Sequence, residues 1–420
     1  MARRSTAELL YSMLGQDPVL RVRDYDGKVF GPAEAKSDIV IRSPKALSYL
    51  ITAPSTLGLA RAYVSGELEI VGDTYEAFSQ MWQDDMADVE FDSVLESLWK
   101  LRHIDRRALR WVKPPESEIG PRGLVGLRHS KRRDAEVIAH HYDVSNAFYE
   151  LILGDSMTYT CAVYPTFEAS LEEAQENKYD LVCRKLGLQP GMRLLDVGCG
   201  WGGMVRHAAK HYGVQAIGVT LSRQQAEWAS KRIADDGLND VAEVRHMDYR
   251  DVPESGFDAV SSIGLTEHIG YKALPSYFTS LYNKLRPQGR LLNHCITRPT
   301  TTEEIKSVGF IDRYVFPDGE LEAVGVIAGV MQDVGFEVRH EENLREHYAM
   351  TLAGWCENLE AHWEACVAEV GIERARVWRL YMNGSRLGFE RRGLELHQVL
   401  AVKVPPGGNA GVPLRPDWGV

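Results

Sequence analysis

Short apolar runs recur through the second half of the chain, and the segments between them have the pattern of helices. Each run has the length of a buried strand. The runs are the one that ends at Asp196 and residues 214–220, 241–247, 257–263 and 290–296. Alternating strands and helices predict an α/β fold with a doubly wound parallel sheet, in which ligands bind beyond the carboxyl ends of the strands.

The elements outside this core follow from the same patterns. Helices are expected over residues 140–151, 171–186, 321–334 and 350–370, with Ser170 as the N-cap of the second. Residues 336–340 and 396–404 should be the last two strands, 157–161 a covering loop and 297–319 a lid. Near the N-terminus, the pattern indicates strands over 19–22 and 38–41 and helices over 44–51 and 74–86. A smaller α+β domain is therefore expected before the main one.

A glycine-rich turn follows the first strand of the sheet. The stretch reads Leu-Leu-Asp-Val-Gly-Cys-Gly-Trp-Gly-Gly from Leu194, with glycines at 198, 200 and 202. Glycine lets the backbone approach a ligand where a Cβ would block it. The spacing is G-x-G-x-G and differs from the G-x-G-x-x-G of dinucleotide binders. By itself the turn is also compatible with an ordinary tight connection between a strand and a helix, the less favoured of the two interpretations.

Composition and charge narrow the class of protein. The chain has 420 residues with 44% hydrophobic and 25% charged, which is typical of a globular protein of one large and one smaller domain. A net charge of −11 disfavours a general nucleic-acid binder. No apolar run approaches the roughly 20 residues that span a bilayer. Six scattered cysteines without a CxxC pair favour a reducing cytosol, with no disulfide and no metal site.

One segment of this acidic chain is basic. Residues 100–133 contain eleven Lys or Arg against three Asp or Glu, with aromatic and apolar residues such as Trp111 between them. One interpretation is a surface that meets anionic phospholipid headgroups, to which each basic residue contributes roughly 1 kcal/mol. The other is a solvated linker between domains, which Pro114, Pro115 and the Gly120-Pro121 pair favour.

Several motifs together carry a family resemblance. The glycine-rich stretch resembles the first motif of class I S-adenosylmethionine (SAM)-dependent methyltransferases, which have a Rossmann-like fold. The segments 141–145 (HYDVS), 159–162 (YTCA), 218–222 (GVTLS) and 266–270 (TEHIG) resemble the cyclopropane-fatty-acid synthase family, which includes the mycolic-acid cyclopropane synthases. The resemblance covers about residues 135–404. It implies an N-terminal domain over 1–112, a basic linker over 113–133, a catalytic domain over 134–404 and an irregular tail over 405–420.

The resemblance implies a set of SAM-binding residues. Gly198, Gly200 and Gly202 would contact the methionine part, and Asp196 would organise their loop. Gln225 would bind the ribose hydroxyls, although a solvated helix position is the plain alternative. Tyr159 and Thr160 would lie on the loop over the cofactor carboxylate, and Thr220 and Leu221 at the end of the second strand. Asp248 and Tyr249 would contact the adenine, and Ile263 would lie in the pocket wall.

The resemblance also implies a bicarbonate ion that acts as a base. Its ligands would be Cys161, Glu267, His294, the backbone at Ile296, and Tyr348. Their chemistry suits an oxyanion, since His, Tyr and a backbone N–H donate hydrogen bonds while Glu accepts one. Each residue taken alone has a structural alternative: a small buried thiol, an acid in the first turn of a helix, a core histidine, or a core tyrosine.

One position departs from the cyclopropane synthases. They carry a Cys near the end of the last long helix where this chain has Ser385. The departure favours the branch that makes 10-methyl fatty acids, the tuberculostearic-acid methyltransferases, over ring formation. The expected enzyme methylates an unsaturated acyl chain, oleoyl first, of a phospholipid. The alternatives are cyclopropane synthesis, methylation of a small molecule, and a lipid-binding protein without catalysis.

The expected surroundings follow from that function. The protein should be cytoplasmic and bind an anionic membrane surface at the inner face of a bacterial plasma membrane. It should form a homodimer and bind no nucleic acid, and a separate flavin-dependent reductase would act on its product.

Overall fold

The computed structural model describes residues 5–12, 14, 19–53, 56–81, 110–119, 133, 145–302, 309–317 and 319–419. The chain divides into two compact units. The first comprises Met1–Pro121, Val308–Val315 and Trp363–Leu387, and the second Arg122–Ser307, Phe316–His362 and Gly388–Val420. The predicted catalytic range 134–404 is therefore not one continuous unit, because two of its segments group with the N-terminal residues. The expected HYDVS motif, except for Ser145, and most of the basic segment lie outside the described residues.

The second unit is built on a seven-stranded sheet of order β10-β11-β9-β8-β5-β6-β7. Its strands are β5 (Arg193–Val197), β6 (Gln215–Thr220), β7 (Ala242–His246), β8 (Phe257–Ile263), β9 (Leu285–Thr297), β10 (Glu337–Asn343) and β11 (Glu395–Val402). The doubly wound parallel arrangement is confirmed for β5 to β9. The strand β11 departs from it, because it pairs antiparallel with both β9 and β10.

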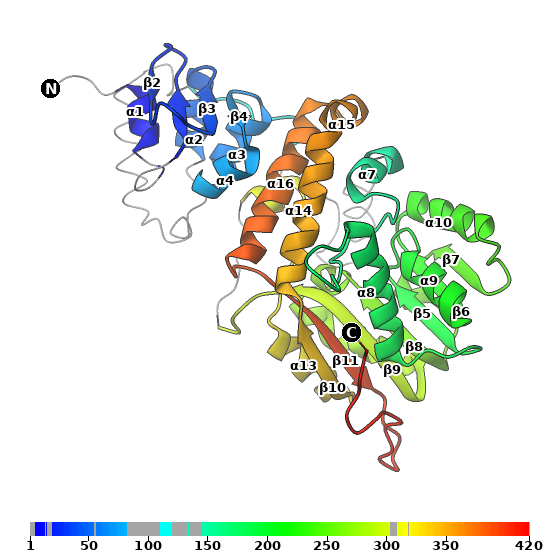
Figure 1. Ribbon diagram of the computed structural model, residues 1–420. Helices are drawn as coiled ribbons and strands as arrows, with labels where there is room; N and C mark the ends of the chain where they lie inside the picture. The colour runs from blue at the N-terminus through cyan, green and yellow to red at the C-terminus, as the bar shows by residue number, and fades with distance from the viewer. Residues whose placement is uncertain are drawn as a thin grey trace. The chain divides into compact units, whose positions relative to one another are not determined.

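Helices cover both faces of this sheet (Figure 1). On one face α8 (Leu171–Leu186), α9 (Gly203–Tyr212) and α10 (Arg223–Asp235) pack against inward residues such as Leu194 and Leu292. On the other, α11 (Leu274–Lys284) and α13 (Val324–Asp333) pack against Leu195 and Leu291. Neighbouring residues of one strand thus enter opposite cores, as alternation along a strand requires.

The other elements of the second unit are short, apart from one long helix. They are α7 (Asn146–Leu153), the 3₁₀ turns η3 (Tyr249–Asp251), η4 (Thr266–His268) and η5 (Tyr271–Ala273), and α14 (Arg345–Ala361). The helix α8 has the predicted bounds, and Ser170 caps it in a reciprocal capping box with Glu173. The single helix predicted over 350–370 is wrong, because α14 ends before His362 and a separate helix follows. Residues 405–419 contain no helix or strand.

The first unit contains a four-stranded sheet of order β2-β1-β3-β4. Its strands are β1 (Arg21–Arg23), β2 (Val29–Phe30), β3 (Ser37–Ile41) and β4 (Leu68–Gly72). Its helices are α1 (Thr6–Tyr11), α2 (Pro44–Thr52), α3 (Thr56–Val64), α4 (Thr74–Met81), α12 (Phe310–Tyr314), α15 (Trp363–Val370) and most of α16 (Ile372–Glu390). This is the small α+β domain that the pattern predicts. No helix within the described part of the chain has the length and apolar character needed to cross a bilayer.

Candidate functional site

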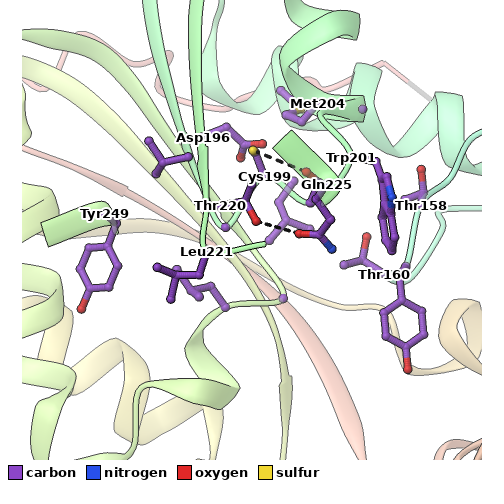
Figure 2. Close-up of a pocket in the computed structure, with 18 of the residues that line it drawn as sticks. Thr158, Thr160, Asp196, Cys199, Trp201, Met204, Thr220, Leu221, Gln225 and Tyr249 are labelled. Atoms are coloured by element: carbon purple, nitrogen blue, oxygen red, sulfur yellow. Dashed lines mark hydrogen bonds between the residues drawn. The ribbon is translucent and has the colours of Figure 1, made fainter. Parts of the chain in front are cut away.

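A pocket opens at the carboxyl ends of the central strands of the second unit (Figure 2). Ten of the twelve residues predicted to bind the cofactor line it: Tyr159, Thr160, Asp196, Gly198, Gly200, Thr220, Leu221, Gln225, Tyr249 and Ile263. They come from the ends of β5, β6 and β8 and the loop after β5, from the helix after β6, from the turn after β7 and from the loop before α8. This edge of a doubly wound sheet is where ligands bind.

The glycine-rich loop shapes one wall of this pocket. Gly198, Gly200 and Gly202 all have positive φ, which an L side chain rarely adopts. A Cβ built on Gly200 would meet no atom within 4 Å, so the backbone there faces open space. Gly202, in contrast, does not line the pocket. A Cβ there would lie 3.0 Å from the Cβ of Ala229, so the structure assigns Gly202 to the packing of α9 against α10.

Thr220 and Gln225 form a buried pair in the pocket wall. The Thr220 hydroxyl donates to Oε1 of Gln225 over 2.7 Å (Figure 2). This bond holds the amide oxygen, so that the Nε2 amide is the end of Gln225 available as a donor to a ligand. Gln225 is only 4% exposed and lines the pocket, so it is not a solvated helix residue.

The predicted adenine residues separate in the structure. Tyr249 lines the pocket and packs edge-on against Tyr277, with ring centroids 5.3 Å apart. Asp248 does not line it. Its carboxylate accepts hydrogen bonds from the guanidinium of Arg250, at 2.8 Å from Nε and 2.6 Å from Nη2. Arg250 is itself a lining residue, so Asp248 orients a side chain of the wall.

A fully buried lysine supports the loop over the pocket. Lys178 donates to the Thr160 hydroxyl and to Oε1 of Gln175, each over 2.9 Å. Nε2 of Gln175 donates to the Thr160 carbonyl, also over 2.9 Å. Burial lowers the pKa of Lys178 to about 7. The pattern of α8 predicted a helix but gave no sign that a lysine faces inward.

Asp196 lies at the base of the glycine loop. Its Oδ1 accepts a 2.6 Å hydrogen bond from the Ser261 hydroxyl on β8. Burial raises the pKa of Asp196 to about 7, while that hydrogen bond and the charge of Lys178 act in the opposite direction. The single hydroxyl donor and the neighbouring cation keep the carboxylate compatible with a buried position.

Glu267 and His294, two of the predicted anion ligands, each carry a buried polar atom that no described residue satisfies. Oε1 of Glu267 accepts a 2.7 Å hydrogen bond from the backbone N–H of Ile296, so the structure brings two predicted anion ligands together. Oε2 of Glu267 and Nε2 of His294 are buried without a hydrogen-bond partner among the described residues. Buried polar atoms normally have partners, so each of these two atoms has the capacity to bind a polar ligand. Burial raises the pKa of Glu267 to about 7 and lowers that of His294 well below its ordinary value.

The remaining predicted catalytic residues lie on other elements. The Cys161 thiol is buried, points to the carbonyls of Ala162 and Leu344, and has a pKa raised by burial. Tyr348 on α14 packs on Phe389 with ring centroids 4.5 Å apart. Neither residue lines the pocket. Ser385 lies on α16, in the first unit, so its role at the site stays a prediction.

Sequence reasoning missed several lining residues. Trp201 stands inside the glycine motif, donates its indole N–H to Asn146 over 2.9 Å and packs on Tyr149. Its place between two glycines was a usable signal. Tyr179 shares a 2.7 Å hydrogen bond with Thr158 and also lines the pocket. Nothing local distinguished that tyrosine from an ordinary residue of α8.

Away from the pocket, Glu176, His207 and His211 bring one ligand atom each within 4.8 Å of one another. Glu176 and His211 are exposed, and the two imidazole rings lie 4.6 Å apart. No residue of this group lines the pocket. The expectation of no metal site was based on the cysteines. It does not bear on this group, which contains no cysteine.

Comparison with known proteins shows which family and which relatives the chain resembles. A family model described as mycolic acid cyclopropane synthetase matches residues 129–399. A probable fatty acid methyltransferase of Mycobacterium tuberculosis is 55% identical, with 99% of both chains covered. A tuberculostearic acid methyltransferase of the same organism is 30% identical, over 92% of this chain and 88% of the relative. The solved structure of a mycolic acid cyclopropane synthase with SAH and CTAB is 31% identical, covers 64% of this chain and 98% of that one, and gives a TM-score of 0.61.

Proposed function

The chain belongs to the mycolic acid cyclopropane synthetase family, and from this premise we propose that it methylates the cis double bond of an unsaturated phospholipid acyl chain, with oleoyl as the first candidate. It is a SAM-dependent lipid methyltransferase. The proposal adds the substrate, the product and the base to that statement. The observation that carries it is the buried, unpartnered atoms of Glu267, which lies between the pocket-lining residues Leu265 and His268, and of His294, which pairs with the pocket-lining Ile263.

The pocket residues fit SAM. The left-handed backbone at Gly200 leaves space where a Cβ would stand, and the Gln225 amide is fixed by Thr220 with its N–H groups available. Tyr249 offers a ring face for adenine, and Thr160 holds the covering loop through Lys178. When bound, SAM supplies an electrophilic methyl group on a sulfonium. The chain's own residues bind and orient that group and exclude water from it.

The buried Oε2 of Glu267 and Nε2 of His294 suit bicarbonate. An anion needs donors, and the unpartnered Nε2 of His294 is one. Burial lowers the pKa of His294, and the charges of Lys178 and Lys185 act in the same direction. Glu267 offers its free Oε2 to the O–H of the ion, and we place Cys161 and Tyr348 around it. The Ile296 N–H, predicted as a ligand of the ion, instead donates to Oε1 of Glu267 and so holds this carboxylate in place. Bicarbonate would supply the base that removes one proton from the methylated chain.

A row of aromatic rings in the second unit supports cationic chemistry. Tyr149, Tyr159, Trp355, Tyr348 and Phe389 form successive ring contacts with centroids 4.5–6.0 Å apart. Methyl transfer to an alkene leaves a carbocation on the acyl chain, and ring faces attract cations. The same apolar surroundings keep out water that would trap the cation.

Ser385 leads us to propose a methylene product. After methyl transfer, a 1,2-hydride shift followed by loss of a proton would leave a 10-methylene chain, which a flavin-dependent reductase would convert to the 10-methyl acid. Cyclopropane formation is the alternative, in which the proton leaves the new methyl group and a ring closes. The relatives stand on both sides, with a tuberculostearic acid methyltransferase 30% and a cyclopropane synthase 31% identical. A lipid-binding protein without catalysis would not need the unpartnered Glu267 and His294 atoms.

We also propose where the protein works. An acyl chain inside a bilayer requires the enzyme to meet a membrane surface, and we place it at the inner face of the bacterial plasma membrane as a peripheral protein. A homodimer and contact with the reductase are further parts of the proposal.

Lipid analysis tests the function directly. We expect that an oleate-containing bacterial host that expresses the chain accumulates phospholipids one CH₂ heavier, and that mild hydrogenation adds two hydrogens to the new chain. The matched control is Glu267→Gln, which should bind SAM but yield little of the product. A mass gain without uptake of hydrogen would mean a cyclopropane, and no mass gain in any unsaturated lipid would reject acyl methylation.

A further inference from the structure

A row of paired residues leads from His294 to the edge strand β10 of the sheet. Register pairs Glu342 of β10 with Gln398 of β11, Gln398 with His294 of β9, and His294 with Ile263 of β8. Paired residues on neighbouring strands point to the same face of a sheet. The row therefore runs from the edge strand to Ile263, which lines the pocket.

Lys185 meets this row from α8. Its side chain is fully buried, and its Nζ donates to the Glu342 carboxylate and, over 2.7 Å, to Oε1 of Gln398. An ammonium group can only donate hydrogen bonds. The amide of Gln398 must therefore turn its oxygen to Lys185 and its NH₂ group away from it.

The NH₂ group of Gln398 lies 3.2 Å from Nδ1 of His294. Gln398 is 0% and His294 1% exposed, so water does not compete for this contact. Because the amide donates, Nδ1 must accept, and a neutral imidazole then carries its proton on Nε2. Nε2 is the ring atom that has no partner among the residues described.

We propose that Lys185 and Gln398 are positioning residues that set the tautomer of His294, so that its Nε2 presents an N–H donor to the anion at the active site. The oriented donor would bind an oxyanion without rearrangement when the ion arrives. If the amide were reversed, Nε2 would present a lone pair, which repels the same ion. The inference rests on the proposed function for the identity of the anion but not for the tautomer.

Lys185→Met is the variant that tests this relay. Methionine fills a similar buried volume, and replacing a buried ion pair with an apolar side chain is often tolerated. Glu342 keeps contact with solvent, since its side chain is 39% exposed. Without Lys185 the Gln398 amide is free to reverse and accept from Nδ1. Lys185→Arg, which still donates, is the conservative control, and calorimetric SAM affinity shows that each variant has folded.

The first measurement is nitrogen NMR of histidine-labelled protein, with the His294 signals assigned by their loss in His294→Gln. We expect the proton on Nε2 in the wild type and in Lys185→Arg, and on Nδ1 in a large fraction of Lys185→Met. A wild-type ring with its proton on Nδ1 would overturn the inference. So would a proton that stays entirely on Nε2 in Lys185→Met.

The second measurement is turnover as a function of bicarbonate concentration. We expect Lys185→Met to need about 10- to 100-fold more bicarbonate, the loss that corresponds to one hydrogen bond to a charged group, with SAM affinity unchanged. A purely structural role of Lys185 would lower kcat without moving the bicarbonate requirement, and that result would reject the anion-binding part. If the NMR result holds but no variant responds to bicarbonate, the relay stands and the proposed base fails.

Discussion

At the scale of single residues, Glu267 is strongly altered by its surroundings. It accepts one hydrogen bond, from the Ile296 N–H, and its second carboxylate oxygen is buried without a partner among the residues described. Burial raises the pKa of Glu267 to about 7, from an ordinary value of 4.5. The charged form is thus disfavoured in the ligand-free protein, as expected for a group that waits for a ligand.

This pKa predicts a pH-dependent stability. An acid whose pKa is higher in the folded state stabilises the fold fully below its unfolded pKa, and this contribution disappears as the pH rises through the folded value. Glu267→Gln cannot ionise and is the reference. Relative to it, the wild type should lose up to about 3 kcal/mol of unfolding free energy between about pH 5 and about pH 8. This limit corresponds to the difference between the folded pKa of about 7 and the ordinary value of 4.5.

Urea unfolding of both proteins without ligands at the two pH values measures this difference. Asp196 also has a raised pKa, but it is present in both proteins and its effect cancels. A difference between the proteins that does not change with pH would show that Glu267 stays in the same protonation state throughout.

At the scale of elements, the junction between β5 and α9 separates two uses of glycine. Gly200 and Gly202 are two residues apart, and both have positive φ. Substitution of either one by an L residue should therefore lower the free energy of unfolding by about 1 kcal/mol or more. Their surroundings differ, because a Cβ at 200 meets open space whereas a Cβ at 202 meets Ala229 and Val244. One glycine keeps room for a ligand, and the other keeps room for a neighbouring helix.

The two positions form a matched pair for mutation. We expect Gly200→Val to abolish SAM binding by filling the space beside the loop, at a modest cost in stability. Gly202→Val should instead destabilise the fold by roughly 1–3 kcal/mol beyond the strain, through overpacking. Calorimetry with SAM and thermal unfolding of both variants give the comparison. Equal SAM affinity in Gly200→Val and wild type would remove this loop from the cofactor site.

At the scale of the whole molecule, charge is unevenly distributed along the chain. The net charge is −11, yet residues 100–133 carry eleven basic residues. Within the described part of that segment, Trp111 is 76% exposed. An exposed tryptophan beside basic residues suits a membrane surface, where the ring lies at headgroup level.

We therefore expect replacement of Arg106, Arg107, Arg110 and Arg132 by Gln to weaken binding to liposomes that contain anionic lipid. The loss should be roughly 1 kcal/mol per residue at low salt and smaller at high salt. The matched control neutralises four exposed lysines elsewhere, Lys28, Lys36, Lys210 and Lys231. Vesicle sedimentation that gives equal binding for both variants would identify the segment as a plain linker.

The βαβ core and most of the cofactor pocket could be predicted from the amino-acid sequence. Apolar runs of strand length, the glycine turn at 198–202 and the cap at Ser170 are local signals, because they depend on the preference of a residue for its own backbone and immediate neighbours. The loops after parallel strands meet at one edge whatever the details of packing. The family resemblance selected the ten predicted residues that line the pocket, and the meeting of the strand ends explains why those that follow β5 to β8 lie together.

Features that depend on residues far apart in the chain could be seen only in the folded protein. The antiparallel insertion of β11 pairs Gln398 with His294 across 104 positions of the chain, and no local pattern specifies such a pairing. The burial of Lys178 and Lys185 depends on which face of α8 meets the sheet and on acceptors that come from elsewhere. For the same reason Gly202 and Asp248, which resemble ligand-binding residues in the sequence, serve packing and the orientation of Arg250 in the fold.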